Sequence, residues 1–201
     1  MDLEDCTERL KPSAAEPEGA KSVIWAPWRL AYVLSAKECG CVFCAKAEQT
    51  DDEANLILAR GRLAFAILNL FPYNNGHLMI VPFRHVAELA DLTPGEMLEM
   101  MCLAQAAEGV LRATMSPEGL NLGMNLGKVA GAGIDDHLHL HLVPRWNGDT
   151  NFMPVLADIN VIPQSLADTY RQLCGPLQNA VNRFAAHSPA SAGGLPPQER
   201  D

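Results

Sequence analysis

The sequence predicts an α+β fold, a five-stranded antiparallel sheet with one long helix packed on it and a helical C-terminal segment. Five short apolar stretches of strand length are bounded by glycine, proline and asparagine. A long run with apolar residues at helical spacing separates the third stretch from the fourth, and a second helical run follows the fifth. Short strands that follow one another closely pair antiparallel, and we expect the helices to cover one side of their sheet.

The five expected strands occupy residues 55–60, 63–70, 77–83, 119–126 and 137–143. Gly61 and Arg62 separate the first two stretches and predict a hairpin. The segment "PYNNG" at 72–76 predicts a turn before the third strand. A glycine-bearing loop, 127–133, connects the last two strands.

The long helix has a clear start in the sequence. Thr93 is a favourable N-cap, Pro94 suits the first helical position, and Glu96 completes a capping box. The helical spacing continues to residue 114. The residues expected on its core side are Met97, Met101, Ala104 and Leu111.

The rest of the chain divides into one domain with two extensions. Residues 163–186 are predicted to be helical, with a break at Gly175–Pro176. Residues 1–21, rich in Ala, Glu and Pro, predict a flexible arm, and residues 187–201 predict a disordered tail. The single domain is therefore expected over 22–186.

Composition excludes several classes of partner. The formal net charge is −9, which disfavours broad contact with nucleic acid or anionic lipid, although a few local donors can hold a small nucleotide. The sequence has neither an apolar run of membrane-spanning length nor the apolar stretch of a secretion signal at its N-terminus. We therefore expect a cytoplasmic protein that binds neither nucleic acid nor membrane.

Three of the six histidines, His137, His139 and His141, alternate with leucines. In a strand this pattern places the imidazoles on one face and the leucines on the other. A merely solvated face favours Thr, Lys or Glu, so two functional interpretations remain: a three-histidine zinc site, or a histidine nucleophile acting on phosphorus. The upstream segment "NLGKVAGAG", 125–133, favours the second because small residues and backbone N–H groups admit a phosphate.

The segment "HLHLHLVPR" resembles the histidine-triad signature of the HIT superfamily of nucleotide hydrolases and transferases. The resemblance extends to "ILNLFPYNNGHLMIVPFRH" at 67–85 and "GLNLGMNLG" at 119–127. The segments "IWAPWR" and "VPRWNGDTNFMPVL" are similar to the bacterial branch related to diadenosine tetraphosphate phosphorylases. The resemblance covers roughly residues 24 to 172 and implies the HIT fold and a homodimer.

The resemblance also implies roles for four histidines. His139 matches the nucleophile that attacks the α-phosphorus and forms a nucleotidyl-histidine intermediate. The backbone carbonyl of His137 orients it, and His141 donates to phosphate or to the leaving oxygen. His77, which follows Gly76, matches an additional histidine beside the triad.

Substrate-binding residues are implied in the same way. Asn69 matches the position that holds the ribose hydroxyls, and Asn125 matches a polar group near the phosphates or the scissile bond. Taken alone, each asparagine is more often a strand-end or turn residue that bonds its own backbone. Trp146 is either a wall of the ligand site or a core residue. The phosphate loop comprises Gly131, Ala132 and Gly133. Relatives often carry a Ser or Thr in this loop, and this chain lacks that hydroxyl.

Cys41 and Cys44 form a C-x-x-C pair, the usual half of a structural zinc site. The resemblance completes the site with His85 and His137, which gives four ligands and no open position. The alternative is a pair of reduced core cysteines with a surface His85. Strand alternation places His137 on the same face as the nucleophile, which conflicts with a role as zinc ligand. No organic cofactor is expected.

The sequence thus predicts an enzyme that cleaves a dinucleoside polyphosphate or another nucleotidyl bond through His139. Water as acceptor gives a hydrolase, and inorganic phosphate gives a phosphorylase. A nucleoside phosphoramidate hydrolase and a zinc-stabilised nucleotide-binding module without catalysis remain as alternatives. A three-histidine metal hydrolase remains as a third alternative.

Overall fold

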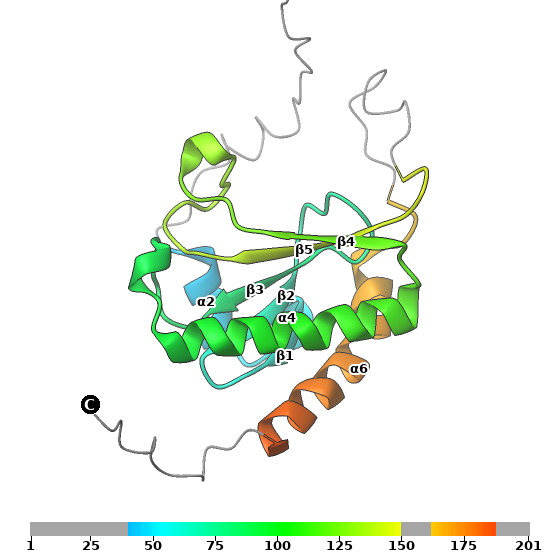
Figure 1. The fold of residues 1–201 in the computed structure, drawn as a ribbon, viewed down its shortest axis with the longest axis horizontal. Helices are drawn as coiled ribbons and strands as arrows, with labels where there is room; N and C mark the ends of the chain where they lie inside the picture. Colours follow the sequence, from blue (N-terminus) through cyan, green and yellow to red (C-terminus); the bar gives the residue numbers. More distant parts are fainter. Residues whose placement is uncertain (1–39, 150–161, 188–201) are drawn as a thin grey trace, which may run out of the picture.

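The structure, a computed structural model, describes residues 40–149 and 162–187, with side chains as far as Phe184. The predicted arm, 1–21, and all but the first residue of the predicted tail lie outside these residues. The described part contains a five-stranded antiparallel sheet with helices packed on it, so the predicted α+β class is confirmed (Figure 1).

The sheet has the strand order β1-β2-β3-β5-β4, and every neighbouring pair is antiparallel. The elements in chain order are α2 (Val42–Glu48), α3 (Asp52–Asn55), β1 (Ile57–Arg60), β2 (Ala64–Leu68), β3 (Leu78–Pro82), η1 (Leu89–Asp91), α4 (Pro94–Met115), β4 (Gly119–Gly123), η2 (Lys128–Ala130), β5 (Leu140–Arg145) and α6 (Leu166–His187). Among the described strands, β4 pairs with β5 alone and is therefore an edge strand of the sheet. None of the described helices is long and apolar enough to cross a membrane.

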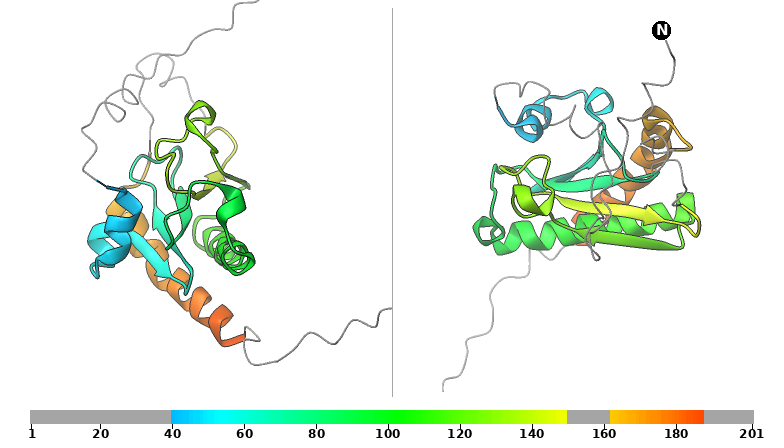
Figure 2. Two further views of the ribbon diagram at one scale, coloured as in Figure 1. Left: turned by 90° about the vertical axis from the view of Figure 1, so that its left-hand side faces the viewer. Right: turned by 90° about the horizontal axis from the view of Figure 1, so that it is seen from above.

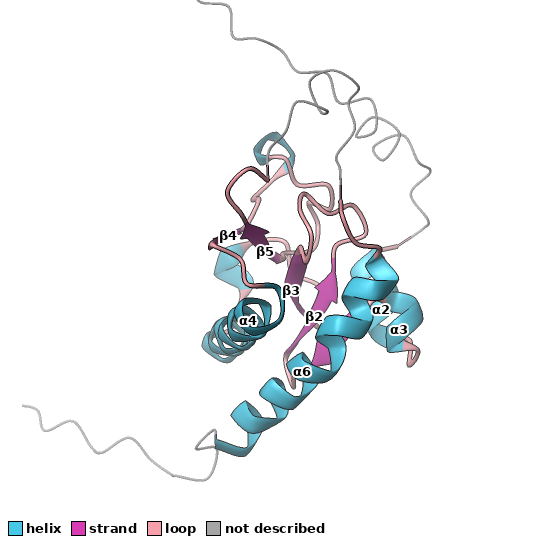
Figure 3. Cartoon of the chain, turned by 90° about the vertical axis from the view of Figure 1, so that its right-hand side faces the viewer, coloured by secondary structure: helices cyan, strands magenta, loops and turns pink. Residues whose placement is uncertain are grey.

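Both faces of the sheet are covered, whereas the sequence predicted cover on one side. Alternate strand residues such as Ile80 and Leu142 pack into the main core with α4 and α6. The intervening residues, Phe65 and Met79 among them, form a second cluster with Phe43 of α2. The left view of Figure 2 and Figure 3 both show α4 and α2 on opposite sides of the sheet. Short alternating strands do not reveal this second layer, because its cover is a helix of only seven residues.

The helix α4 begins as predicted, with Thr93 as N-cap and the capping box to Glu96 formed. Its predicted core side is wrong in part, since the side chains of Met97 and Met101 are 41% and 54% exposed. The helix instead buries a side that includes Met100 and Leu103. Apolar residues surround the first half of this helix, so helical spacing fits more than one side equally well.

The predicted helix break at Gly175–Pro176 is also wrong, because α6 continues through Pro176. An internal proline costs a helix about 3 kcal/mol. Leu173 and Leu177, on either side of it, are both only 1% exposed and belong to the main core. Burial of two leucines contributes about 3–6 kcal/mol, which offsets that cost.

Candidate active site and metal site

The histidine run is not one regular strand. The strand β5 begins at Leu140, and His137 lies in a bend before it. Backbone hydrogen bonding nevertheless begins before β5, because the N–H of Leu138 donates to the Val86 carbonyl at 2.7 Å. His139 and His141 line a cavity on the α2 side of the sheet, whereas the ring of His137 turns toward Cys41. The conflict posed by strand alternation is therefore resolved by the bend.

His139 has a defined tautomer. Its Nδ1 lies 2.8 Å from the His137 carbonyl oxygen, and a carbonyl can only accept a hydrogen bond, so Nδ1 carries the proton. Burial lowers the pKa of His139, although this hydrogen bond opposes the shift. The ring also packs against Phe43, with the centroids 5.2 Å apart. The imidazole is therefore neutral, and Nε2 holds a free lone pair.

A chain of hydrogen bonds also fixes the proton of His141. The backbone N–H of Tyr73 donates to Nδ1 of His77 at 3.0 Å, so that nitrogen is unprotonated. Burial, together with His141 and His139, lowers the pKa of His77 to about 3, so its ring is neutral with the proton on Nε2. That proton is donated to Nδ1 of His141 at 2.9 Å. His141 must then carry its own proton on Nε2.

The Nε2–H of His141 has no partner. Within the described part of the chain, this nitrogen is the buried side-chain atom left without a hydrogen bond. Burial, and the neighbouring His139, lower the pKa of His141 to about 4, so the ring is neutral at pH 7. A buried donor that lacks a partner is costly unless a ligand supplies the acceptor. The cavity is therefore lined by the Nε2 lone pair of His139 and by the Nε2–H donor of His141.

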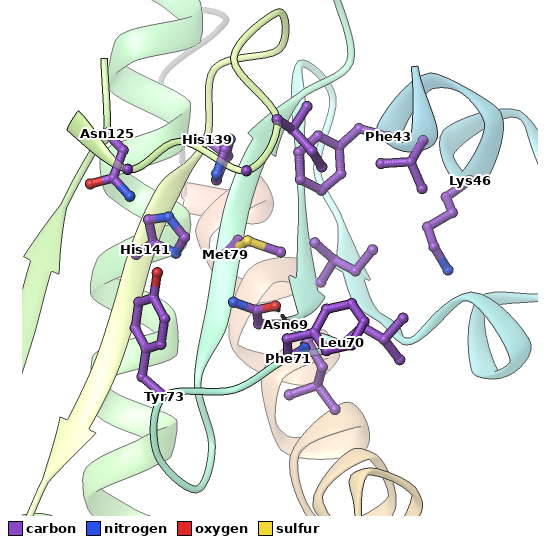
Figure 4. A pocket seen from close by; sticks show the side chains of 16 residues that line it. Phe43, Lys46, Asn69, Leu70, Phe71, Tyr73, Met79, Asn125, His139 and His141 are labelled. Carbon is purple, nitrogen blue, oxygen red and sulfur yellow. Dashed lines mark hydrogen bonds between the residues drawn. The ribbon is translucent and has the colours of Figure 1, made fainter. Parts of the chain in front are cut away.

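The cavity has a polar and an apolar end (Figure 4). The polar end contains Asn125, His139 and His141, and the apolar end contains Phe43, Leu70 and Phe71, with Lys46 beside them. Val42, Ile67, Gly131 and Gly133 also line the cavity. Asn69 also lines the cavity. Its side-chain oxygen accepts from the Phe71 N–H at 3.0 Å, and its amide nitrogen lies 3.3 Å from Nδ1 of His77.

Two of the predicted substrate residues do not line this cavity. The Trp146 indole N–H donates to the Ser116 carbonyl at 3.2 Å, so this side chain joins the end of β5 to the end of α4. Ala132 is absent from the described lining, whereas its two glycine neighbours are present. Arg145 is a structural residue, because its Nε donates to Asp149 at 2.6 Å.

Phe43, Lys46 and Tyr73 are among the lining residues that the sequence interpretation missed. Phe43 lies between the two cysteines of the C-x-x-C pair, so the position of that pair beside the triad could have indicated it. Tyr73 lies in the turn before His77, and its role depends on a backbone hydrogen bond that no residue pattern encodes. Lys46 follows one turn after Phe43 on α2.

The four predicted metal ligands come together, with ligand atoms of Cys41, Cys44, His85 and His137 within 4.8 Å of one another. Nδ1 of His137 lies 3.2 Å from Cys41 Sγ and 3.6 Å from Cys44 Sγ, and Nδ1 of His85 lies 3.5 Å from Cys44 Sγ. Tetrahedral zinc with ordinary bond lengths gives a sulfur–nitrogen separation of about 3.6 Å. The spacing therefore fits zinc.

The protonation of His137 also fits a metal ligand. Its Nε2 lies 2.9 Å from the Pro82 carbonyl oxygen and must donate to it, which leaves the Nδ1 lone pair directed at the cysteines. Burial, with contributions from Cys41, raises the pKa of Cys44 to about 11. A cation at this position would offset the cost of holding two thiolates together. Four protein ligands leave no open position, so such a metal is structural.

Comparison with known proteins agrees with this geometry. A sequence model described as the HIT domain matches residues 50–148. The chain is 45% identical over 158 residues to the AP-4-A phosphorylase of Mycobacterium tuberculosis, covering 75% of this chain and 81% of the relative. It is 32% identical over 93 residues to the asymmetrical bis(5′-nucleosyl)-tetraphosphatase of Schizosaccharomyces pombe, covering 46% and 50%.

Among solved structures, a Zn-bound histidine triad family protein from Mycobacterium smegmatis superposes with a TM-score of 0.55 at 25% identity. The superposition covers 73% of this chain and 96% of that protein. The sequence identity, the shared fold and the histidine run with its flanking segments together show that this chain belongs to the HIT, or histidine triad, family.

Proposed function

We propose that this protein transfers a nucleotidyl group through a covalent intermediate on His139. One observation carries the proposal: an unprotonated Nε2 on His139 and an unpartnered Nε2–H on His141 belong to the same cavity. The first is a nucleophile, and the second is a donor for an anionic oxygen. Relatives named as a phosphorylase and a tetraphosphatase of dinucleotides support a dinucleoside polyphosphate as the small-molecule substrate.

The cavity offers a place for each part of such a substrate. The apolar end, with Phe43 and Leu70, suits a nucleobase, and Asn69 lies where a ribose would follow. Gly131 and Gly133 also line the cavity. Because they have no side chain, phosphate oxygens can approach the main chain of this loop, a contact that we propose replaces the missing loop hydroxyl.

In the first step, Nε2 of His139 attacks the α-phosphorus. The new N–P bond forms as the P–O bond to the leaving nucleotide breaks, and the leaving oxygen takes the bonding electron pair. The N–H of His141 donates a hydrogen bond to the phosphate oxygens as charge develops on them. The positive charge that grows on the His139 ring strengthens its hydrogen bond to the His137 carbonyl.

In the second step, an acceptor oxygen attacks the same phosphorus and the N–P bond breaks, returning the electron pair to His139. Water as acceptor releases a nucleoside monophosphate. Inorganic phosphate releases a nucleoside diphosphate, so that diadenosine tetraphosphate yields ADP and ATP. Both outcomes use the same intermediate, and the acceptor alone distinguishes hydrolysis from phosphorolysis.

The test compares wild type with His139→Ala on diadenosine tetraphosphate, with and without phosphate. We expect the variant to lose turnover while it still binds AMP in calorimetry, because the cavity walls remain. Mass spectrometry of the wild type should find an adenylated His139. Wild-type rates in His139→Ala would refute covalent catalysis. Binding without turnover in the wild type would favour the non-catalytic module, and turnover of adenosine phosphoramidate alone would favour the phosphoramidate hydrolase.

We further propose that Cys41, Cys44, His85 and His137 hold a structural zinc, a set that would connect α2 to the bend before β5. Cysteine thiolates of this kind persist in a reducing compartment, which supports a cytoplasmic location. Elemental analysis should find one zinc per chain in the wild type and none in Cys44→Ser. During incubation with a chelator, the melting temperature should fall gradually. Immediate inhibition, reversed by added metal, would indicate a catalytic metal instead.

We also propose a homodimer formed through the edge strand β4. This strand ends the sheet, and it lies on the same side of the molecule as α4 (Figure 3). Leu122 of β4 is 47% exposed, and Leu98 of α4 is 68% exposed. Unpaired edges beside apolar side chains favour pairing of sheets. Light scattering should give twice the chain mass for the wild type and the chain mass for Leu122→Lys, whereas a monomeric wild type would contradict the proposal.

A further inference from the structure

Tyr73 lies at the polar end of the cavity, in a position that the mechanism above does not use. Its ring stacks near His77 and His141, with centroids 4.8 Å and 6.1 Å away. In Figure 4 its hydroxyl points toward the ring of His141, and Asn125 lies on the other side of that ring. The side chain is 49% exposed, so this part of the cavity is open to solvent.

Phosphoryl-type displacement is roughly in line, with the attacking and leaving atoms on opposite sides of the phosphorus. In the first step the leaving oxygen is therefore opposite Nε2 of His139. In the second step the acceptor must enter opposite the same nitrogen, where the leaving group was. Groups that line the solvent-open side beside His141 are thus placed to bind the acceptor.

The chemistry of this side favours phosphate over water. Water needs a base to remove its proton as it attacks, but none of the described residues that line the cavity is Asp or Glu. His141 offers no free lone pair, since its Nδ1 accepts from His77 and its Nε2 carries a proton. Phosphate dianion is already a nucleophile and needs only hydrogen-bond donors. The Tyr73 hydroxyl, the Asn125 amide and the His141 N–H are such donors.

We propose that Tyr73, with Asn125 and His141, forms an acceptor subsite for inorganic phosphate, and that its hydroxyl selects phosphorolysis over hydrolysis. This inference rests on the proposed transfer through His139. The phosphate oxygen forms a new bond to the α-phosphorus, the N–P bond breaks, and His139 recovers its lone pair. Tyr73 is thereby a residue that determines acceptor specificity.

The test measures how the intermediate divides between two acceptors. Adenosine 5′-phosphoramidate is the donor: as Nε2 of His139 bonds to the phosphorus, the P–N bond to the amino group breaks and the amine takes a proton from solvent and leaves as ammonia, so that no phosphate is released. The ratio of ADP to AMP, followed as phosphate is increased, then reports only the second step. Tyr73→Phe keeps the ring and removes the hydroxyl. Tyr170→Phe is the matched control, since Tyr170 is a buried tyrosine of α6 in the main core, outside the described cavity lining.

We expect Tyr73→Phe to need about tenfold more phosphate than the wild type to reach the same ADP to AMP ratio, the effect of one lost hydrogen bond to an anion, about 1.4 kcal/mol. Tyr170→Phe should leave both the ADP to AMP ratio and the rate of phosphoramidate consumption without phosphate within about twofold of the wild type.

Two outcomes would overturn the inference, and they are distinguishable. An unchanged ratio in a Tyr73→Phe enzyme that still turns over would refute the acceptor role and leave the proposed function intact. A wild type that forms neither an adenylated His139 nor any product, from diadenosine tetraphosphate or from the phosphoramidate, would refute the proposed function, and the acceptor subsite with it. Circular dichroism and melting temperature of both variants establish that the comparison is between folded proteins.

Discussion

Gly76, which precedes His77, should be among the least replaceable glycines of the chain's described part, because its backbone and its surroundings both exclude a side chain. It has φ of +73°. A Cβ placed on it would lie 2.7 Å from Sδ of Met115, 3.2 Å from Cδ2 of Leu111 and 3.3 Å from Cγ of Pro144. Gly109, within α4, offers a matched control, since a Cβ there has no heavy atom within 4 Å.

The cost of Gly76→Ala has two parts. The left-handed backbone costs a residue with a Cβ about 1–2 kcal/mol. Crowding costs about 1–3 kcal/mol, and it falls in the lower part of that range because the Met115 side chain is flexible. The free energy of unfolding should therefore fall by about 2–4 kcal/mol. For a domain of this size each kcal/mol lowers the melting temperature by about 2–4 °C. Gly109→Ala should instead gain about 0.5–1 kcal/mol, because alanine favours a helix interior.

Urea and thermal unfolding, followed by circular dichroism, check both predictions: a loss of stability in Gly76→Ala and a gain in Gly109→Ala. The same proteins should differ in activity, since displacement of His77 disturbs the hydrogen bond that fixes the proton of His141. The reasoning would be refuted if Gly76→Ala unfolded within about 0.5 kcal/mol of the wild type, the range of a neutral surface substitution. Equal destabilisation by Gly109→Ala would refute it as well.

The pH dependence of kcat/KM should show an acid limb below the ordinary histidine pKa of 6.5, because burial lowers the pKa of both His139 and His141, the latter to about 4, and the reactive forms are neutral. A midpoint at or above 6.5 in a kcat/KM profile would contradict this protonation scheme. The hydrogen bond from Arg84 lowers the pKa of Glu96 from 4.5 to about 2. The ionised Glu96 should therefore stabilise the fold above pH 4.5, and this stabilisation should be lost as the pH falls from 4.5 toward 2. Glu96→Gln should cost about 1–3 kcal/mol at pH 7 and less at pH 3 in urea titrations, and an equal cost at both values would contradict it.

The elements that follow from local chemistry were predicted well. The start of α4 depends on Thr93 and Glu96, which lie within one turn of each other, and the structure forms the expected capping box. The hairpin at Gly61 likewise follows from a few neighbouring residues. Where an element depends on distant partners, prediction failed. The helix α6 passes through Pro176 because distant core residues bury the turns on either side of it.

In the site, too, the features that depend on neighbouring residues were predicted, and those that depend on distant partners were not. Strand alternation placed His139 and His141 in one cavity, but it could not place His137, because the bend before β5 depends on partners from other segments. Nδ1 of His137 is directed at Cys41, about a hundred residues earlier in the chain, and Nε2 donates to the Pro82 carbonyl. The main-chain carbonyl of the same residue fixes the tautomer of His139.

The protonation pattern is the part of the site that no sequence pattern encodes, since each proton is assigned by a backbone group. The Pro82 carbonyl assigns the proton of His137, the His137 carbonyl assigns that of His139, and the Tyr73 N–H assigns those of His77 and His141. The sequence motif identifies which histidines are present, whereas the main-chain geometry determines which nitrogen of each ring attacks, donates or binds metal. The same three histidines therefore carry three different chemistries in this chain, a lone pair for phosphorus, an N–H for an anion, and a lone pair for a metal.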